Sequence, residues 1–432
     1  MTLHPRLRQI LTVGSVESIG VILGGISGLL IVNLLPKDQY ATYTFLVACM
    51  TLMLGITDTG LAHVALPVVG ERADDSSWVM ASCRRVFQKR WILLFGGFLI
   101  VVPYWLFTTR DHGWAGGGYW TASFFILVAL LLALREHYAG TVFMILRQIP
   151  TLNRISFSSS ILRIAFVCAA LMLPLGGYSV AGVTAATAVA SAFAILMYRR
   201  AFVAGAYVAR PLSKPEAKEV DSRIFRIAKP LMLPAVFYQF QGVITVFLAS
   251  LFGNPAMLAE VGAFGRLGMM LIVFDRVAGT VLFPVIASAP DGPRLRSIIL
   301  KSHLLYIGIM VLVFLSSLLL PNWWILLIGS QYKDRESLVW MVFAATLLIN
   351  GAGFAFKTVA ARGHTARQTL IIPFVLAIQV SYLWIFGASS LRAVLGFSIA
   401  TALGNCIYQY GMLGTWFIAQ RRERQAEPQR SA

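Results

Sequence analysis

Charged residues are scarce in this chain, and acidic residues are the scarcest of them. Only 12% of the 432 residues are charged, whereas soluble proteins of this length carry about a quarter. With 58% hydrophobic residues and a mean hydropathy of +0.75, too little polar surface remains to cover a water-soluble globule. The composition therefore indicates a membrane protein, with lipid as part of its solvent.

Cysteine pairs, metal-ligand clusters and nucleotide-binding signatures are also lacking. The six histidines form no H-E-x-x-H pattern, and no Walker A, G-x-S-x-G or G-x-G-x-x-G segment occurs. The sequence thus predicts no disulfide framework, no metal site, no cofactor and no enzyme activity. The four cysteines, none of them in a C-x-x-C pair, are Cys49, Cys83, Cys168 and Cys406.

Long apolar segments fill most of the chain. A transmembrane helix needs about 20 mainly apolar residues, and about twelve segments meet that length. None alternates polar and apolar residues as a barrel strand would, so the sequence predicts an all-α polytopic membrane protein. The predicted spans are 11–35, 40–69, 91–107, 119–134, 155–174, 180–197, 227–253, 257–287, 303–320, 338–360, 370–386 and 391–418.

The excess of basic residues fixes the predicted orientation. The net charge of +18 is compatible with nucleic-acid binding or with basic cytoplasmic loops. With the N-terminus in the cytoplasm, about 29 of the Lys and Arg side chains fall on the cytoplasmic side and about five on the other. This bias predicts cytoplasmic N- and C-termini and no nucleic-acid partner. It includes two basic loops, at 84–90 and 199–229, and a basic tail.

The basic segment after the sixth span divides the chain near its middle. Two sets of six spans predict two pseudo-symmetric six-helix lobes around a central cavity, as in secondary transporters. The N-terminal lobe is predicted at 1–198 and the C-terminal lobe at 227–418. A basic cytoplasmic linker at 199–226 joins them, and a basic tail follows at 419–432.

Two arginines in the eighth predicted span are candidates for substrate binding. Arg266 lies roughly 13 Å into the span, too deep for its side chain to reach the interface easily, and Arg276 follows about 15 Å further along the axis. Guanidinium groups match diphosphate oxygens, so the pair would suit an anionic cargo. The alternative is that Asp275 and Arg276 neutralise local partners while Arg266 lies near the outer interface.

Glu17 is the charged residue of the first span. It shares a helix face with Gly20, Gly24 and Gly28, because offsets of three, seven and eleven residues fall on one side of a helix. The glycines predict close helix packing. Glu17 either lines a cavity beside that ridge or reaches the cytoplasmic interface.

Three further polar residues in predicted spans are candidates. Asp58 is a counter-ion, a coupling-ion ligand or part of a helix irregularity. Lys357 binds substrate or extends to the cytoplasmic interface, and Gln239, in a span with two prolines, lines the cavity or pairs with a neighbouring helix.

Three stretches carry a resemblance to a known family. They are ISGLLIVNLLPKDQYATYTFLVACMTLMLGITDTG at 26–60, VGAFGRLGMMLIVFDRVAGTVLFP at 261–284 and IGSQYKDRESLVWMVFAATLLINGAGFAFKTVAARGHTARQ at 328–368. The chain resembles the polysaccharide flippases of the multidrug/oligosaccharidyl-lipid/polysaccharide exporter superfamily. It departs from them near Thr245 and Val246, where many relatives have an Asp-Arg-like pair.

The resemblance implies a rocking-bundle transporter of the bacterial inner membrane. Its cargo would be an oligosaccharide on a polyprenyl pyrophosphate, flipped to the periplasmic leaflet for O-antigen or exopolysaccharide synthesis. Arg266 would meet the diphosphate, with Arg276, Gln239 and Lys357 as further cavity residues. Glu17, Asp58 and Asp275 would be counter-ions or sites for coupling to Na⁺ or H⁺, and the partners would include the polysaccharide polymerase and the chain-length machinery.

Other functions stay open at this stage. A drug or cation antiporter of the related extrusion family would favour acidic and aromatic cavity residues, and Glu17 and Asp58 keep that alternative. A membrane-bound polymerase or ligase would need a large external loop, whereas the external stretch at 332–336 is short. A non-transporting scaffold in a polysaccharide assembly complex is the third alternative.

Overall fold

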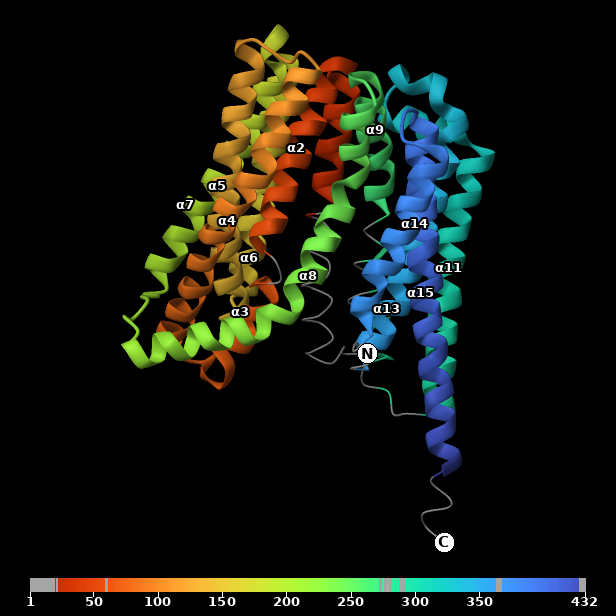
Figure 1. The fold of residues 1–432 in the computed structure, drawn as a ribbon. Coiled ribbons are helices and arrows are strands. Elements are labelled where there is room, and N and C mark those ends of the chain that lie inside the picture. The colour runs from red at the N-terminus through yellow and green to blue at the C-terminus, as the bar shows by residue number, and fades with distance from the viewer. Residues whose placement is uncertain are drawn as a thin grey trace, which may run out of the picture. The chain divides into compact units, whose positions relative to one another are not determined.

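Helices form every regular element in the part of the chain that the computed structural model describes. The described residues are 20, 22–58, 61–271, 274, 275, 278, 282, 283, 285, 286, 289, 292–362 and 367–426. The longer helices in the first part of the chain are α2 (Lys37–Asp58), α3 (Leu61–Val69), α4 (Ser76–Asp111), α5 (Gly117–Ile145), α6 (Ile149–Met172), α7 (Ser179–Ala204), α8 (Lys214–Phe252) and α9 (Pro255–Met270). They are followed by α11 (Pro293–Leu319), α12 (Pro321–Ile328), α13 (Val339–Ala360), α14 (Ile371–Phe386) and α15 (Leu391–Ala426), and Figure 1 shows them as a set of long rods.

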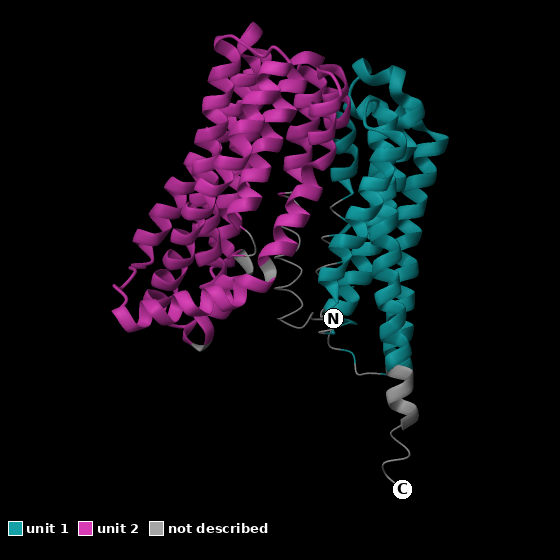
Figure 2. Cartoon of the chain, in the orientation of Figure 1, with its two compact units in different colours: residues 1–18, 263–432 teal, residues 19–262 magenta. Residues whose placement is uncertain are grey.

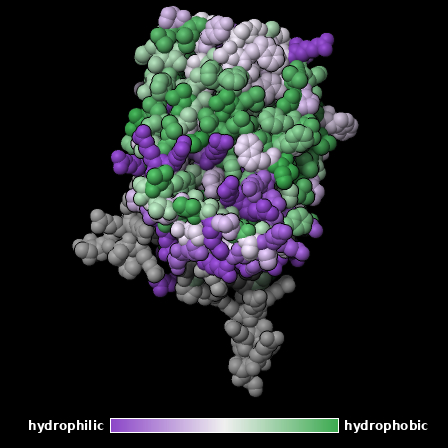
Figure 3. All heavy atoms as spheres, turned by 90° about the vertical axis from the view of Figure 1, so that its left-hand side faces the viewer, coloured by the Kyte–Doolittle hydropathy of each residue, from purple (hydrophilic) through white to green (hydrophobic). Residues whose placement is uncertain are grey.

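Ten helices of the described residues are long and apolar enough to cross a membrane. A shorter apolar helix at Ile22–Leu34 and α9 fall on the two other predicted spans, both of which continue beyond the described residues. Hydrophobic side chains cover much of the face in Figure 3, and most of the hydrophilic ones gather at its middle and below. The prediction of an all-α polytopic membrane protein is confirmed.

Contacts divide the chain into two compact units, coloured separately in Figure 2. Unit 1 comprises residues 1–18 and 263–432, and unit 2 comprises residues 19–262. In unit 2, α2 packs on α4 and α8, and α7 packs on α5 and α6; in unit 1, α13 packs on α11 and α15. The unit boundary therefore falls within α9, after α8, and the predicted division into lobes at 199–226 stays a prediction.

The two predicted basic loops are largely helical, which corrects the sequence interpretation. The residues at 84–90 lie inside α4, which begins at an Asp75 cap whose carboxylate accepts from the backbone N–H groups of Ser77 and Trp78. The predicted linker at 199–226 contains only a short connection, because α7 continues to Ala204 and α8 begins at Lys214. Lys and Arg are good helix formers, so a cluster of them need not end a helix.

A capping box starts α8. The Ser213 hydroxyl accepts from the Glu216 backbone N–H at 3.4 Å, and the Glu216 carboxylate accepts from the Ser213 backbone N–H at 2.9 Å. That hydrogen bond and the one from Arg210 lower the pKa of Glu216 to about 2. The helix start therefore keeps its carboxylate at any physiological pH.

The first part of α8 lies across the ends of the spanning helices of unit 2, and Figure 1 shows the helix then bending to run along them. Pro230 and Pro234 lie inside α8 and account for the bend, because proline removes a backbone donor and displaces the preceding turn. Val220, Ile224 and Ala228, spaced by four residues, are buried against α3, α4 and α5. This amphipathic face attaches the segment to unit 2.

Asp221 adds a polar attachment between α8 and α4. Its carboxylate accepts two hydrogen bonds from Arg85, at 3.1 and 2.9 Å, and lies 3.4 Å from the Lys89 ammonium. Burial alone would raise the pKa of Asp221, but the Arg85 hydrogen bonds and the Lys89 charge outweigh it and hold the pKa below its usual range. Its stabilising contribution is therefore present at neutral pH and is lost only as pH falls below about 3.9, the value for a free aspartate.

Asp221→Asn is expected to loosen the first part of α8 at neutral pH. Loss of the charge weakens the contacts with Arg85 and Lys89, so amide hydrogen exchange in residues 214–229 should rise about tenfold. Glu219→Gln is the control, because Glu219 pairs with the exposed Arg223 of the same helix and should change little. Equal exchange in wild type and Asp221→Asn would contradict the proposed attachment.

Candidate functional site

Asp58 and Arg90 form an ion pair between α2 and α4 in unit 2. Asp58 is the last residue of α2, and an Arg90 guanidinium N–H donates to its carboxylate. Arg90 is only 7% exposed, so its charge needs this partner. Asp58 is thus a counter-ion to a cation that the sequence had assigned to a cytoplasmic loop.

The side chain of Gln239 in α8 packs against helix α2. A Cβ at Gly55 would come within 2.4 Å of the Gln239 amide oxygen, so this α8 side chain covers the α2 backbone. Gly55 is buried and Gln239 half-buried. The contact places the Gln239 side chain in the packing of α8 on α2, which favours helix packing over the predicted cavity role of Gln239.

Asp275 and Lys357, predicted separately, lie together in unit 1. The Lys357 ammonium donates to the Asp275 carboxylate at 2.5 Å, and it also lies 5.6 Å from the centre of the Phe283 ring. Both charged side chains are about one third exposed. Lys357 is in the last turn of α13, where the helix dipole also favours a cation.

Polar side chains of α11, α13 and α15 pair with one another within unit 1. The Tyr306 hydroxyl donates to the Asn350 amide oxygen at 3.0 Å, and Tyr410 and His303 share a hydrogen bond of 2.7 Å. The rings of His303, Tyr306 and Phe283 all pack on Phe354. An aromatic surface therefore adjoins the Asp275–Lys357 pair.

Arg266 is half-buried in α9 and directs a guanidinium N–H towards the Met269 sulfur at 3.7 Å. The first half of α9 belongs to unit 2, where Glu260 is 3% exposed and accepts from the Lys37 ammonium at 2.6 Å. Glu260 was not among the residues predicted from the sequence. The sequence offered one signal for this pair: Glu260 lies inside the predicted span 257–287, and Lys37 lies just before the predicted span 40–69.

Glu136 and Arg163 were also missed. Glu136 of α5 lies within reach of Ser191 of α7 and of the Arg163 charge in α6. Helix α5 continues past the end of the predicted span 119–134, through Arg135, Glu136 and His137, to Ile145. Arg163 lies inside the predicted span 155–174, and its position there was the signal for an intramembrane charge.

Glu17 and Arg276 lie outside the described residues. The structure thus pairs Asp58 with Arg90 and Asp275 with Lys357, places Gln239 on Gly55, and puts Arg266 on α9. In the described spans, the carboxylates of Asp58 and Asp275 each form an ion pair with a cation of their own unit. Such matching keeps charges tolerable within a membrane.

Comparison with known proteins identifies the fold. No protein-family model and no curated protein matches the chain. Among solved structures, an inward-facing multidrug resistance MATE family transporter of the MOP superfamily is similar, with a TM-score of 0.69 and 18% identity over 96% of both chains.

Two further solved structures are similar over nearly their whole length. A MOP superfamily transporter from Pyrococcus furiosus has a TM-score of 0.61 and 17% identity, over 98% of this chain and 95% of that one. A eukaryotic MATE transporter has a TM-score of 0.60 and 13% identity, over 98% of this chain and 99% of that one. The chain therefore has the fold of the MATE-like transporters of the MOP superfamily.

Proposed function

We propose that this chain is a transporter of the bacterial inner membrane that flips an anionic lipid-linked oligosaccharide to the periplasmic leaflet by alternating access. The similarity to transporters over at least 96% of the chain supports transport rather than covalent chemistry. The three resembling sequence stretches support a polyprenyl-pyrophosphate-linked saccharide as the cargo. Polysaccharide polymerase and chain-length proteins would then act on the product.

The charges of the described spans carry the anionic part of the proposal. The carboxylates of Asp58 and Asp275 are each paired with a cation of the chain, so a cationic cargo would have to displace that cation. An arginine that donates to one carboxylate keeps further N–H groups for an anion. Arg266 adds a fourth cation to Arg90, Arg163 and Lys357.

The fold alone does not set the charge of the cargo. The Pyrococcus furiosus transporter is described as having a binding pocket of reversed polarity, which suggests a different function for that protein. Pockets of different polarity thus occur on this fold. Local charge is therefore a better guide to this chain's cargo than its fold.

A drug or cation antiporter is the second candidate. The aromatic side chains around Asp275, which include Phe283 and Phe354, would suit a cationic amphiphile if Lys357 moved away. The similar solved structures include a multidrug resistance transporter. Export of a cationic dye that depends on Asp275 would favour this function.

Arg266→Gln tests the flippase proposal. In proteoliposomes that contain a fluorescent polyprenyl-pyrophosphate oligosaccharide, the variant should flip at least about tenfold more slowly, because a charge-assisted hydrogen bond to the diphosphate is lost. Arg266→Lys keeps the charge but not the planar guanidinium, so its flipping rate should lie between those of wild type and Arg266→Gln. An unchanged flipping rate in Arg266→Gln would contradict the proposed role of Arg266. Imposing a Na⁺ gradient and a H⁺ gradient in separate experiments would identify the coupling ion.

A further inference from the structure

A small, open pocket lies among α3, α4 and α5 of unit 2. One face of α4 supplies half of its lining, because Cys83, Val86, Phe87 and Arg90 follow a helical spacing of three and four residues. The other lining residues are Leu61 and Ala65 of α3 and Tyr138 and Thr141 of α5.

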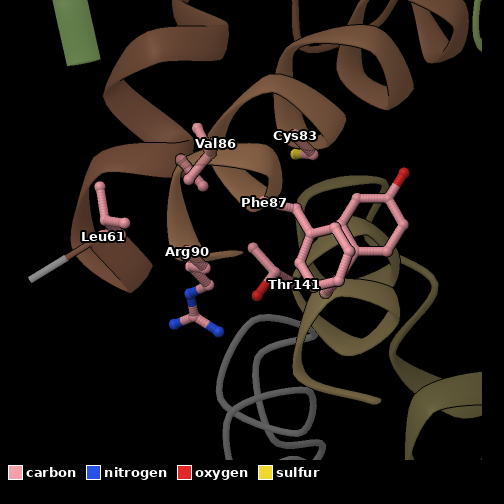
Figure 4. Close-up of a pocket in the computed structure, with 8 residues that line it drawn as sticks. Leu61, Cys83, Val86, Phe87, Arg90 and Thr141 are labelled. Carbon is pink, nitrogen blue, oxygen red and sulfur yellow. The ribbon is translucent and has the colours of Figure 1, made fainter. Parts of the chain in front are cut away.

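Arg90 is the charged residue of this pocket. Its side chain is 8% exposed, and Asp58 is its hydrogen-bond partner among the described residues, through one terminal nitrogen. A guanidinium carries five N–H groups, so the pair leaves donors for a second anion. In the view of Figure 4, the polar ends of Arg90 and Thr141 both point away from Val86 and Cys83.

The other side chains that line the pocket are apolar or already have hydrogen-bond or ring contacts within the protein. The Thr141 hydroxyl donates to the His137 carbonyl at 2.8 Å, and the Phe87 and Tyr138 rings pack with their centres 5.0 Å apart. Leu61, Ala65 and Val86 are buried. A ligand would therefore meet hydrocarbon on several sides and one cation.

The predicted span 91–107 would place the pocket near the level of the lipid headgroups. Arg90 directly precedes the apolar segment 91–107, whose 17 residues span about 25 Å of helix. Trp91, Ile92, Phe95 and Leu99 on that segment are exposed large hydrophobic side chains, as expected of a surface in contact with lipid. Tryptophan is also typical of the membrane–water interface.

We propose that this pocket binds the phosphate headgroup of an anionic amphiphile, with Arg90 as the phosphate ligand and Asp58 as the internal anion that competes for it. The enclosed space is that of about one or two water molecules, so it would admit the phosphate oxygens while the hydrocarbon chain stays outside the pocket. The site requires only a phosphate joined to hydrocarbon. It is independent of a saccharide cargo.

The opposite effects of two substitutions test this site. Native mass spectrometry of the full-length protein in detergent would measure its affinity for dioleoyl phosphatidic acid. Arg90→Gln should weaken the tightest-bound lipid by about tenfold, through loss of a charge-assisted hydrogen bond. Asp58→Asn should strengthen it by a similar factor, because the competing carboxylate is gone. Ala65→Leu, which narrows the pocket without changing a charge, should weaken binding even if Asp58→Asn does not fold.

The controls separate this site from general attraction to a basic surface. Arg84→Gln removes an exposed cation of α4 that does not line the pocket, so this variant should bind as wild type. Equal binding by wild type and Arg90→Gln would overturn the proposal. Displacement of the lipid by an equal concentration of inorganic phosphate would overturn its hydrocarbon part. Because Arg266→Gln should leave this binding unchanged, failure of the flippase proposal would be seen separately.

Discussion

Gly118→Ala is expected to destabilise unit 2 strongly although alanine is the better helix former. Gly118 lies in the first turn of α5, where an added Cβ would come within 2.2 Å of the Gly177 carbonyl oxygen. That oxygen belongs to the backbone of the turn before α7, so it cannot rotate aside as a flexible side chain could. The overlap should cost about 1–3 kcal/mol or more and lower the unfolding temperature of the purified protein.

Gly140→Ala is the matched control in the same helix. Its Cβ would make ordinary contacts, 3.6 Å from the Tyr198 hydroxyl and 3.7 Å from Leu152. The substitution should leave the unfolding temperature unchanged or raise it, because alanine gains up to about 1 kcal/mol of helix propensity over glycine. Fluorescence-detected size-exclusion chromatography after heating would compare the two. If Gly118→Ala unfolds at the same temperature as wild type, the close approach of α5 to the Gly177 carbonyl is wrong.

The fold could be predicted from sequence because lipid imposes a length on each apolar segment. The ends of the helices could not be predicted equally well, since apolarity marks the membrane-spanning part and not the helix. The Asp75 cap begins α4 well before Trp91, and the good helix formers Arg, Gln and Lys at 84–90 continue it. The bend of α8 follows from Pro230 and Pro234, but a hydropathy pattern does not contain the packing of its first part against α3, α4 and α5.

Some charged residues of the candidate site could be singled out from the sequence, but their ion pairs could not. Intramembrane charge singled out Asp58, Asp275 and Lys357 because a charge in hydrocarbon is costly. The partner of Asp58 is Arg90, 32 residues further on in a segment that was interpreted as a loop. Asp275 and Lys357 are 82 residues apart. Only the tertiary packing of separate helices brings such pairs together.

The Asp275–Lys357 pair allows its structural and functional contributions to be separated. Lys357→Met leaves the Asp275 carboxylate among apolar helices, and Asp275→Asn leaves the Lys357 ammonium there. Each should lower the free energy of unfolding by about 1.5–3 kcal/mol, the range for hydrogen bonds to charged groups. The costs of a fully buried pair would be larger, but these side chains are 35% and 31% exposed. The double variant should cost less than the sum, because no unpaired charge remains.

Transport by the double variant decides what the pair does. If Lys357 meets the anionic cargo, the Asp275→Asn, Lys357→Met protein should regain stability and still flip lipid-linked oligosaccharide at least about tenfold more slowly than wild type. If the pair only joins α13 to the segment around Asp275, transport should return together with stability. The second result would assign Lys357 to the fold and leave Arg266 to carry recognition in unit 1. Stability and flipping measured on the same four proteins therefore distinguish an ion pair that holds helices together from one that also binds cargo.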